Sequence, residues 1–306
     1  MPTLKRLLIS YFSVGVFIAS LVLQAQPKVI LDLWPALPPG DVVTDKKEQD
    51  ATKATENLVG GRRLIRLADV SKPTLSFFPA VRSKQTGAIV VVFPGGGYNI
   101  LALDLEGSEV CEWLNELGVN AVLVKYRVPR PTGLPPHARA LQDAQRAMGL
   151  VRSKAGEWGL DPGRVGALGF SAGGHLVATL TASALDARSY AGVDAADQFS
   201  CRPNFQVLVY PAYLTPKDSM DKLSAEVRVD EKTPPTFIVI SQDDPVHVEN
   251  ALVYYSAMQK ARVPGEMHIF PAGGHGYGLR RTAMPITGWP KMAAEWMFHQ
   301  GLMRLP

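Results

Sequence analysis

The segment GFSAGGH, residues 169–175, has residue types and a spacing that could perform chemistry. Gly169, Ser171 and Gly173 fit the pattern GxSxG, in which a strained turn between a strand and a helix lifts a serine above a sheet. Alone, this pattern fits a plain turn equally well. Its context favours a reactive turn, because an apolar run precedes the serine and a segment with helical spacing follows it. We therefore predict that Ser171 is a nucleophile.

A serine hydroxyl is a weak nucleophile at neutral pH, so a base must accept its proton and an acid must orient that base. His275 lies in GGHGYG directly after an apolar run, where glycines let a loop carry a side chain back over the sheet. His268 lies inside that run and His247 near the start of a helical segment, so we expect packing or surface roles for both. His275 is therefore the predicted general base.

Two aspartates compete for the role of the acid. Asp243 and Asp244 follow the apolar run FIVIS, and catalytic loops of open α/β sheets gather where strands end. The order DPV after a strand resembles the acid loop of the superfamily named below, and this resemblance favours Asp244; Asp243 would then cap the turn or the next helix. Asp244 is the predicted acid, and Asp243 is the alternative.

Acyl transfer also needs hydrogen-bond donors at the place where the oxyanion forms. The sequence PGGGY, residues 94–98, follows another apolar run, and we expect the N–H of Gly96 or Gly97 to act together with that of Ala172. Which glycine donates stays open. Loops of the HGGG type begin with a histidine, and Pro94 stands at that position here. No side chain at this position can therefore brace the loop through a hydrogen bond.

Apolar runs and helical segments alternate along the rest of the chain. Continuous apolar runs predict strands buried on both faces of a parallel sheet, here at 88–93, 121–125, 165–170, 205–210, 237–241 and 267–270. Helical spacing lies between them and near 290–302. This alternation predicts an α/β fold with a doubly wound, mostly parallel sheet and helices on both faces. Two more strands, at 62–67 and 73–78, are expected at the edge in antiparallel pairing.

The start of the chain has the layout of a secretory signal. Lys5 and Arg6 precede an apolar run that ends at Leu23, and Ala25 follows it. We expect residues 1–25 to be a signal peptide and the protein to be secreted or periplasmic. An uncleaved membrane anchor is the alternative, because Leu23 is not a small residue. Residues 26–59 are expected to form an N-terminal arm and residues 60–306 one catalytic domain.

Charge and motif spacing exclude several classes of partner. The formal charge is +4, from 32 basic and 28 acidic residues that are dispersed along the chain, so we expect no nucleic-acid partner and no membrane contact beyond the N-terminal segment. The spacing HExxH and paired cysteines are absent from the sequence, and the glycine run lacks GK[ST]. We expect no metal and no cofactor, and the oligomeric state is left open.

Six segments together resemble the esterase and lipase branch of the α/β-hydrolase superfamily with an HGGG-type oxyanion loop: PGGGY, KYRVPR, LQDAQRA, GFSAGGHL, VYPAY and GGHGYG. Within that branch the chain resembles bacterial acetylxylan-esterase-like and feruloyl-esterase-like carbohydrate esterases, from about residue 60 onward. The resemblance implies attack by Ser171 on an ester carbonyl, an acyl-enzyme, and hydrolysis by water activated through His275.

Substrate size rests on weaker signals. Tyr98, Tyr213 and Tyr277 lie beside the motifs and are expected in the substrate pocket, although such residues are as often packing. The polar segment 214–234 indicates a small cap rather than a lipase lid, so we expect a small-molecule or oligosaccharide ester as substrate.

Three alternatives to an esterase stay open. They are an exopeptidase-like serine hydrolase, an acyltransferase, and a non-catalytic binding protein with this fold. A complete set of Ser171, Asp244 and His275 in the expected chain order argues against the binding protein. The arm of about 35 residues is too short to form the propeller that such exopeptidases carry.

Overall fold

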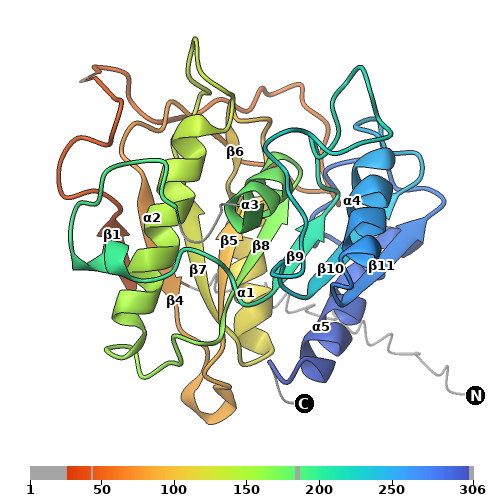
Figure 1. Ribbon diagram of the computed structural model, residues 1–306. Helices are drawn as coiled ribbons and strands as arrows, with labels where there is room; N and C mark the ends of the chain where they lie inside the picture. The colour runs from red at the N-terminus through yellow and green to blue at the C-terminus, as the bar shows by residue number, and fades with distance from the viewer. Residues whose placement is uncertain (1–25, 43, 183–186, 303–306) are drawn as a thin grey trace, which may run out of the picture.

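The computed structural model describes residues 26–42, 44–182 and 187–302, so the expected signal segment 1–25 lies outside the described residues. Among these residues, the main sheet has eight strands in the order β1-β4-β7-β5-β8-β9-β10-β11 (Figure 1). The strands are β1 (Val29–Asp32), β4 (Thr74–Phe78), β7 (Asn120–Lys125), β5 (Ile89–Phe93), β8 (Val165–Phe170), β9 (Gln206–Val209), β10 (Thr236–Ser241) and β11 (Gly265–Phe270). β4 pairs antiparallel with β1 and β7, and every other pair is parallel.

Helices cover both faces of this sheet (Figure 1). On one face lie α1 (Glu109–Glu116) and α5 (Trp289–His299), whose Trp113 and Trp289 rings are 5.6 Å apart. On the other face lie α2 (Ala138–Ala155), α3 (Ala172–Ala182) and α4 (Glu249–Lys260). The predicted doubly wound, mostly parallel α/β sheet is thus confirmed.

The strand order reverses next to β5, and this reversal fixes where a site can form. β5 lies between β7 and β8, so the chain leaves β5 to build one side of the sheet and returns at β8 to build the other. The loops after β5 and β8 therefore diverge and leave a crevice at the carboxyl ends of these two strands. PGGGY follows β5, and Ser171 follows β8.

The N-terminal arm is part of the fold rather than a loose cover. β1 forms the edge of the main sheet, with Val29 opposite Phe77 and Asp32 opposite Thr74. Buried polar contacts then fix the next residues on α2: Trp34 donates to Asp143 at 2.7 Å, and Arg146 donates to the carbonyl of Leu33 at 2.8 Å. The segment LQDAQRA thus anchors the arm.

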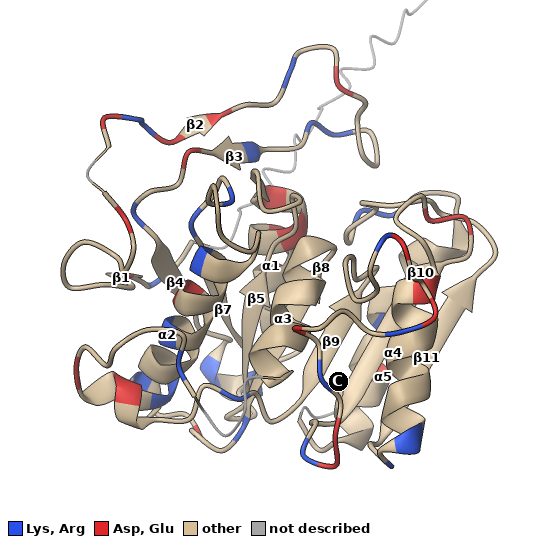
Figure 2. Cartoon of the chain, turned by 45° about the horizontal axis from the view of Figure 1, so that its top comes forward, with Lys and Arg blue, Asp and Glu red and all other residues tan. Residues whose placement is uncertain are grey.

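A small second sheet lies beyond the strand ends of the main sheet (Figure 2). It is formed by β2 (Gln49–Asp50), β3 (Arg66–Ala68) and β6 (Leu101–Ala102). The expectation of a sheet-edge strand at 62–67 is therefore wrong: only 66–68 is a strand, and it pairs with the chain that follows the glycine loop. The side chains of β3 are only partly buried, so this strand does not pack into the core of the main sheet.

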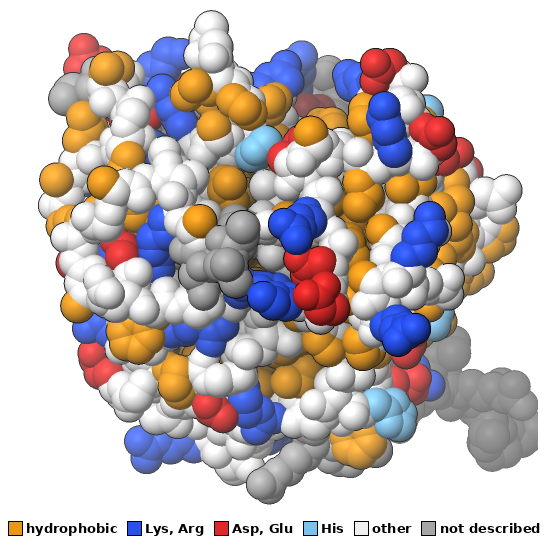
Figure 3. Space-filling view, in the orientation of Figure 1, with side chains coloured by type: hydrophobic (Ala, Val, Ile, Leu, Met, Phe, Trp, Pro, Cys, Tyr) orange, Lys and Arg blue, Asp and Glu red, His pale blue; other side chains and the backbone are white. Residues whose placement is uncertain are grey.

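The surface carries basic and acidic side chains interspersed on the face drawn in Figure 3. Within the described residues, no helix has both the length and the apolar character needed to cross a membrane.

Candidate active site

Ser171 lies on the strained turn that the sequence predicts. Its φ is +51°, a left-handed value that non-glycine residues seldom adopt, and it is the single residue between β8 and α3. A Cβ on Gly169 would lie 2.2 Å from the carbonyl oxygen of Gly173, and one on Gly173 would lie 2.1 Å from that of Phe93. Only glycine at these two positions lets the helix start so close to the strands.

Three predicted residues meet at this turn. The Nε2 atom of His275 is 2.8 Å from the Oγ atom of Ser171, and its Nδ1 atom is 2.8 Å and 3.0 Å from the two carboxylate oxygens of Asp244. The Asp244 side chain is 0% exposed and also accepts the N–H of Val246 at 2.7 Å. An imidazole held in this way by a buried carboxylate can receive the serine proton at Nε2.

The other candidates for the base and the acid lie apart from this contact. Asp243 accepts the N–H of Gly274 at 2.9 Å, which lowers the pKa of its carboxyl and braces the loop that carries His275. His268 lies on β11 and contacts Glu266 at 2.7 Å, while His247 is exposed just before α4. The geometry therefore favours Asp244 and His275.

The glycine loop faces the same serine. Gly96 and Gly97 line a cavity together with Ser171 and His275, and both have a positive φ. A Cβ on Gly96 would lie 2.0 Å from the carbonyl oxygen of Ile100, so the loop requires glycine there. Ala172, the predicted partner donor, is the first residue of α3.

Glu106 is a part of the site that the sequence analysis missed. Its carboxylate accepts the N–H of Gly95 at 2.7 Å and the hydroxyl of Tyr210 at 2.8 Å, and the residue is only 4% exposed. Burial raises the pKa of this carboxyl. Glu106 thus supplies the brace that Pro94 cannot. The one available signal was that Glu106 is one of two acids, with Asp104, in the mainly apolar stretch that follows the glycine loop.

The cavity at Ser171 has a volume of about 600 Å³, and the arm forms part of its wall. Thr55, Glu56, Asn57 and Val59 lie on that wall together with Arg66 of β3. Polar groups from the arm therefore face the nucleophile across the cavity.

The three predicted pocket tyrosines differ in position. Tyr213 is 36% exposed and lines the cavity at Ser171. Tyr98 is buried, and its hydroxyl lies 2.7 Å from Nδ1 of His175 in a neighbouring cavity of about 210 Å³. Tyr277 lies outside the lining of both cavities, contrary to expectation, because its ring packs at 4.5 Å against that of Tyr210.

Comparison with known proteins agrees with this geometry. A family model of the α/β-hydrolase fold matches residues 90–230. An acetylxylan esterase of Xylanibacter ruminicola is 31% identical over 239 residues, which are 70% of this chain and 46% of that protein. Endo-1,4-beta-xylanase B of Butyrivibrio fibrisolvens is 29% identical over 222 residues, 65% of this chain and 34% of that protein. The chain thus spans between a third and a half of the length of these two relatives.

A solved structure matches over nearly the whole chain. The acetyl ester-xyloside bifunctional hydrolase from Caldicellulosiruptor lactoaceticus superposes with a TM-score of 0.69 at 31% identity, covering 92% of this chain and 99% of that one. Together with the strand order and the strained serine turn, this similarity shows that the chain belongs to the α/β-hydrolase family, in its esterase and lipase branch.

Proposed function

We propose that this protein is a serine hydrolase of carboxylic esters, with Ser171 as nucleophile, His275 as general base and Asp244 as the acid that orients it. One observation carries the proposal: His275 joins the Ser171 hydroxyl to the buried Asp244 through both ring nitrogens. The names of the relatives add support, since they include an acetylxylan esterase and an arylesterase.

The reaction follows from these contacts. His275 Nε2 takes the proton of Ser171 while Oγ bonds to the ester carbonyl carbon, and the imidazolium then gives that proton to the departing alcohol oxygen. Water attacks the resulting acyl-enzyme with His275 again as base, which releases the acid and restores the serine. Asp244 stabilises the imidazolium in both halves of the reaction.

We assign the oxyanion site to the N–H of Ala172 and to that of Gly96 or Gly97. The N–H of Gly95 already donates to Glu106, which leaves the next two glycines of the loop to face the nucleophile. Donors held rigidly in place stabilise the charge that develops on the carbonyl oxygen, and this contribution is often the largest in acyl transfer.

The substrate that we propose is an acetylated plant polysaccharide or its oligosaccharides. Residues 26–59 form the arm and residues 60–306 the catalytic domain, and the arm's Thr55, Glu56 and Asn57 offer hydrogen-bonding groups opposite Ser171. A sugar alcohol is rich in hydroxyl groups that such side chains can bind. Tyr213 adds a ring on which a sugar can stack.

Rates of hydrolysis test this proposal. Purified protein and its Ser171→Ala variant are compared on p-nitrophenyl acetate, acetylated xylan, a feruloylated oligosaccharide and an aminoacyl-anilide. We expect serine-dependent release of acetate from xylan. Preference for the anilide would favour the exopeptidase, and absence of serine-dependent turnover on all four would favour a binding protein.

We further propose that residues 1–25 direct export and are removed after Ala25. The basic pair, apolar run and small residue of this segment support the proposal. The mass of the protein recovered outside the cytoplasm tests it: a chain that begins at Gln26 agrees, whereas an intact, membrane-associated chain favours the anchor.

A further inference from the structure

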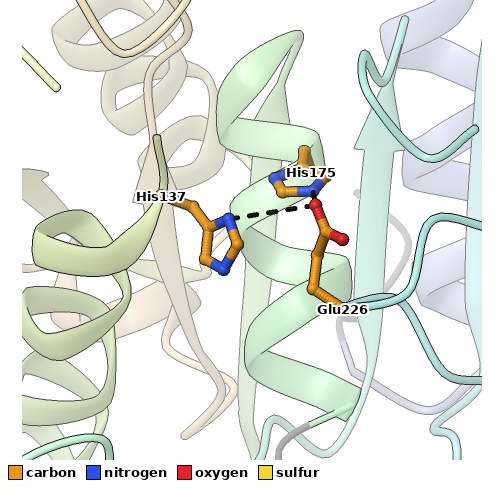
Figure 4. A group of neighbouring side chains, drawn as sticks. All are labelled: His137, His175 and Glu226. Carbon is orange, nitrogen blue, oxygen red and sulfur yellow. Dashed lines mark hydrogen bonds and ion pairs between the residues drawn. The ribbon is translucent and has the colours of Figure 1, made fainter. Parts of the chain in front are cut away.

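A second cluster of side chains lies one helical turn beyond the nucleophile. His137, directly before α2, His175 of α3 and Glu226 of the segment between β9 and β10 point toward one another (Figure 4). Their ligand atoms all lie within 4.8 Å of one another. From this convergence we propose that the three side chains bind a zinc ion, independently of the proposed ester hydrolysis.

The spacing of the ligand atoms suits a tetrahedral ion. Glu226 Oε1 lies 3.2 Å from Nε2 of His175 and 3.9 Å from Nδ1 of His137. Bonds of about 2.0–2.1 Å at tetrahedral angles require ligand atoms about 3.3–3.5 Å apart. The two imidazole nitrogens lie within 4.8 Å of each other. Shifts of up to about 0.7 Å in each ring, together with rotation of the Glu226 side chain, would bring all three atoms to that spacing.

The types of ligand favour zinc over the hard cations. Two imidazoles and one carboxylate match the nitrogen and oxygen ligands that zinc accepts, whereas calcium and magnesium prefer oxygen alone. The histidines are also sheltered, since the His175 and His137 side chains are 2% and 12% exposed. A sheltered site holds its ligands with little loss of side-chain freedom on binding.

Tyr98 orients one of the ligands. Its buried hydroxyl lies 2.7 Å from Nδ1 of His175, which turns Nε2 toward Glu226 and the proposed ion. A hydrogen-bond partner on the non-coordinating nitrogen fixes the ring and its tautomer, as is usual for histidine ligands.

The remaining side of the site opens to the cavity of about 210 Å³, which Arg130 and Lys217 also line. The positive charges of Arg130 and Lys217 repel a zinc ion, but both side chains are exposed, so solvent screens this repulsion. They favour an anion or hydroxide as the fourth ligand, so the site would keep the open position typical of zinc bound by three side chains.

Zinc at this position would connect three separate segments of the chain. Glu226 lies in the polar segment 214–234, and His137 and His175 lie at the two helices beside it. The Tyr98 and Tyr213 rings are stacked with centroids 6.3 Å apart, and Tyr213 also lines the cavity at Ser171. The ion would thus hold the wall of the catalytic cavity without taking part in its chemistry.

Zinc titration of the tag-free full chain, stripped with a chelator, tests the proposal. We expect one Zn²⁺ per chain by calorimetry, a higher Tm with zinc, and at least about tenfold weaker binding in His137→Ala and Glu226→Gln. His268→Ala, which removes a histidine from β11, is the matched control and should bind like the parent. His275→Ala should also retain the ion, since it is outside the site.

Two further measurements keep the proposal falsifiable if a ligand variant misfolds. Tyr98→Phe keeps all three ligands and should weaken zinc binding about 10–100-fold. Co²⁺ in place of zinc should give the strong visible absorption of a tetrahedral site, and this absorption should vanish in Glu226→Gln. Failure of the folded parent to bind Zn²⁺, or unchanged binding in both ligand variants, would overturn the proposal.

Discussion

Two histidine–carboxylate pairs occupy adjoining cavities that share Gly97 and Tyr213. His275 contacts the fully buried Asp244 at 2.8 Å, whereas His175 contacts Glu226, which is 35% exposed, at 3.2 Å. Both carboxylates orient an imidazole. The pairs differ in the group that contacts the second ring nitrogen, and this difference separates the proposed site for acyl transfer from the proposed site for binding.

The third group in each cavity decides the chemistry. Ser171 presents a hydroxyl on a strained turn beside a cavity of about 600 Å³, where a carbonyl carbon can approach. Tyr98 presents a phenol that is 1% exposed and whose pKa burial raises well above its ordinary value. The hydroxyl of this phenol is directed at Nδ1 of His175, so the second pair is suited to holding a ligand.

Removal of the nucleophile should have the largest effect. Ser171→Ala is expected to lower kcat/KM on p-nitrophenyl acetate by about 10⁶-fold, because the base then has no hydroxyl to activate. Ser219→Ala, which changes a half-buried serine in the segment 214–234, is the control and should retain the parental rate. Comparable rates in the parent and Ser171→Ala would remove the serine from the mechanism.

Asp244→Asn should have the next largest effect, a loss of about 10⁴-fold in kcat, because the amide favours the wrong tautomer of His275. Asp243→Asn changes a neighbouring carboxylate that contacts the backbone of the His275 loop and the Ser241 side chain, and it should cost far less. Steady-state kinetics of both variants decide between the two acids. A larger loss in Asp243→Asn would reverse our assignment.

Glu106→Gln tests the brace on the glycine loop. The Glu106 carboxylate uses one oxygen for Gly95 and the other for Tyr210, whereas the glutamine amide has a single oxygen. One of these two hydrogen bonds should therefore be lost, and the glycine loop should become less ordered. We expect kcat to fall about tenfold, less than the 10²–10³ that follows loss of a direct oxyanion donor. Glu116→Gln, exposed at the end of α1, is the control for the charge change.

The same variant should alter the pH dependence of stability. Burial raises the pKa of Glu106, so its contribution is fully present below pH 4.5, the ordinary value, and is lost as the pH rises through the higher folded value. Glutamine does not titrate. The unfolding free energy of Glu106→Gln relative to the parent should therefore increase as the pH rises above 4.5, which denaturant titrations at several pH values can measure. A constant difference would contradict the raised pKa.

Glu226→Gln should have the smallest effect on hydrolysis. Its partly exposed contact with His175 is worth about 0–1 kcal/mol, so kcat/KM should change by less than about tenfold. The contrast with Asp244→Asn is the direct test of the comparison between the two pairs. Equal losses in both variants would mean that the second cavity takes part in ester hydrolysis.

Much of this protein is determined locally by its sequence. Continuous apolar runs mark buried parallel strands, and the structure has each of the six parallel runs within two residues of its expected position. The small residues around Ser171 specify a tight strand-to-helix turn, and the glycines at 95–97 specify a loop of unusual backbone angles. Because parallel strands end at one edge of the sheet, chain order alone predicts that Ser171, Asp244 and His275 approach one another.

Other features depend on packing between segments far apart in the chain. Glu106 reaches Gly95 only because the turn after β6 is buried against the strand ends, and the arm reaches the cavity only because β3 pairs with β6. His175 lies in helix α3, and Glu226 lies 51 residues later in an irregular segment. His137 comes from a third place, directly before α2. Histidines that look scattered in the sequence therefore converge, since short-range patterns of hydrophobicity and backbone preference carry no information about such contacts.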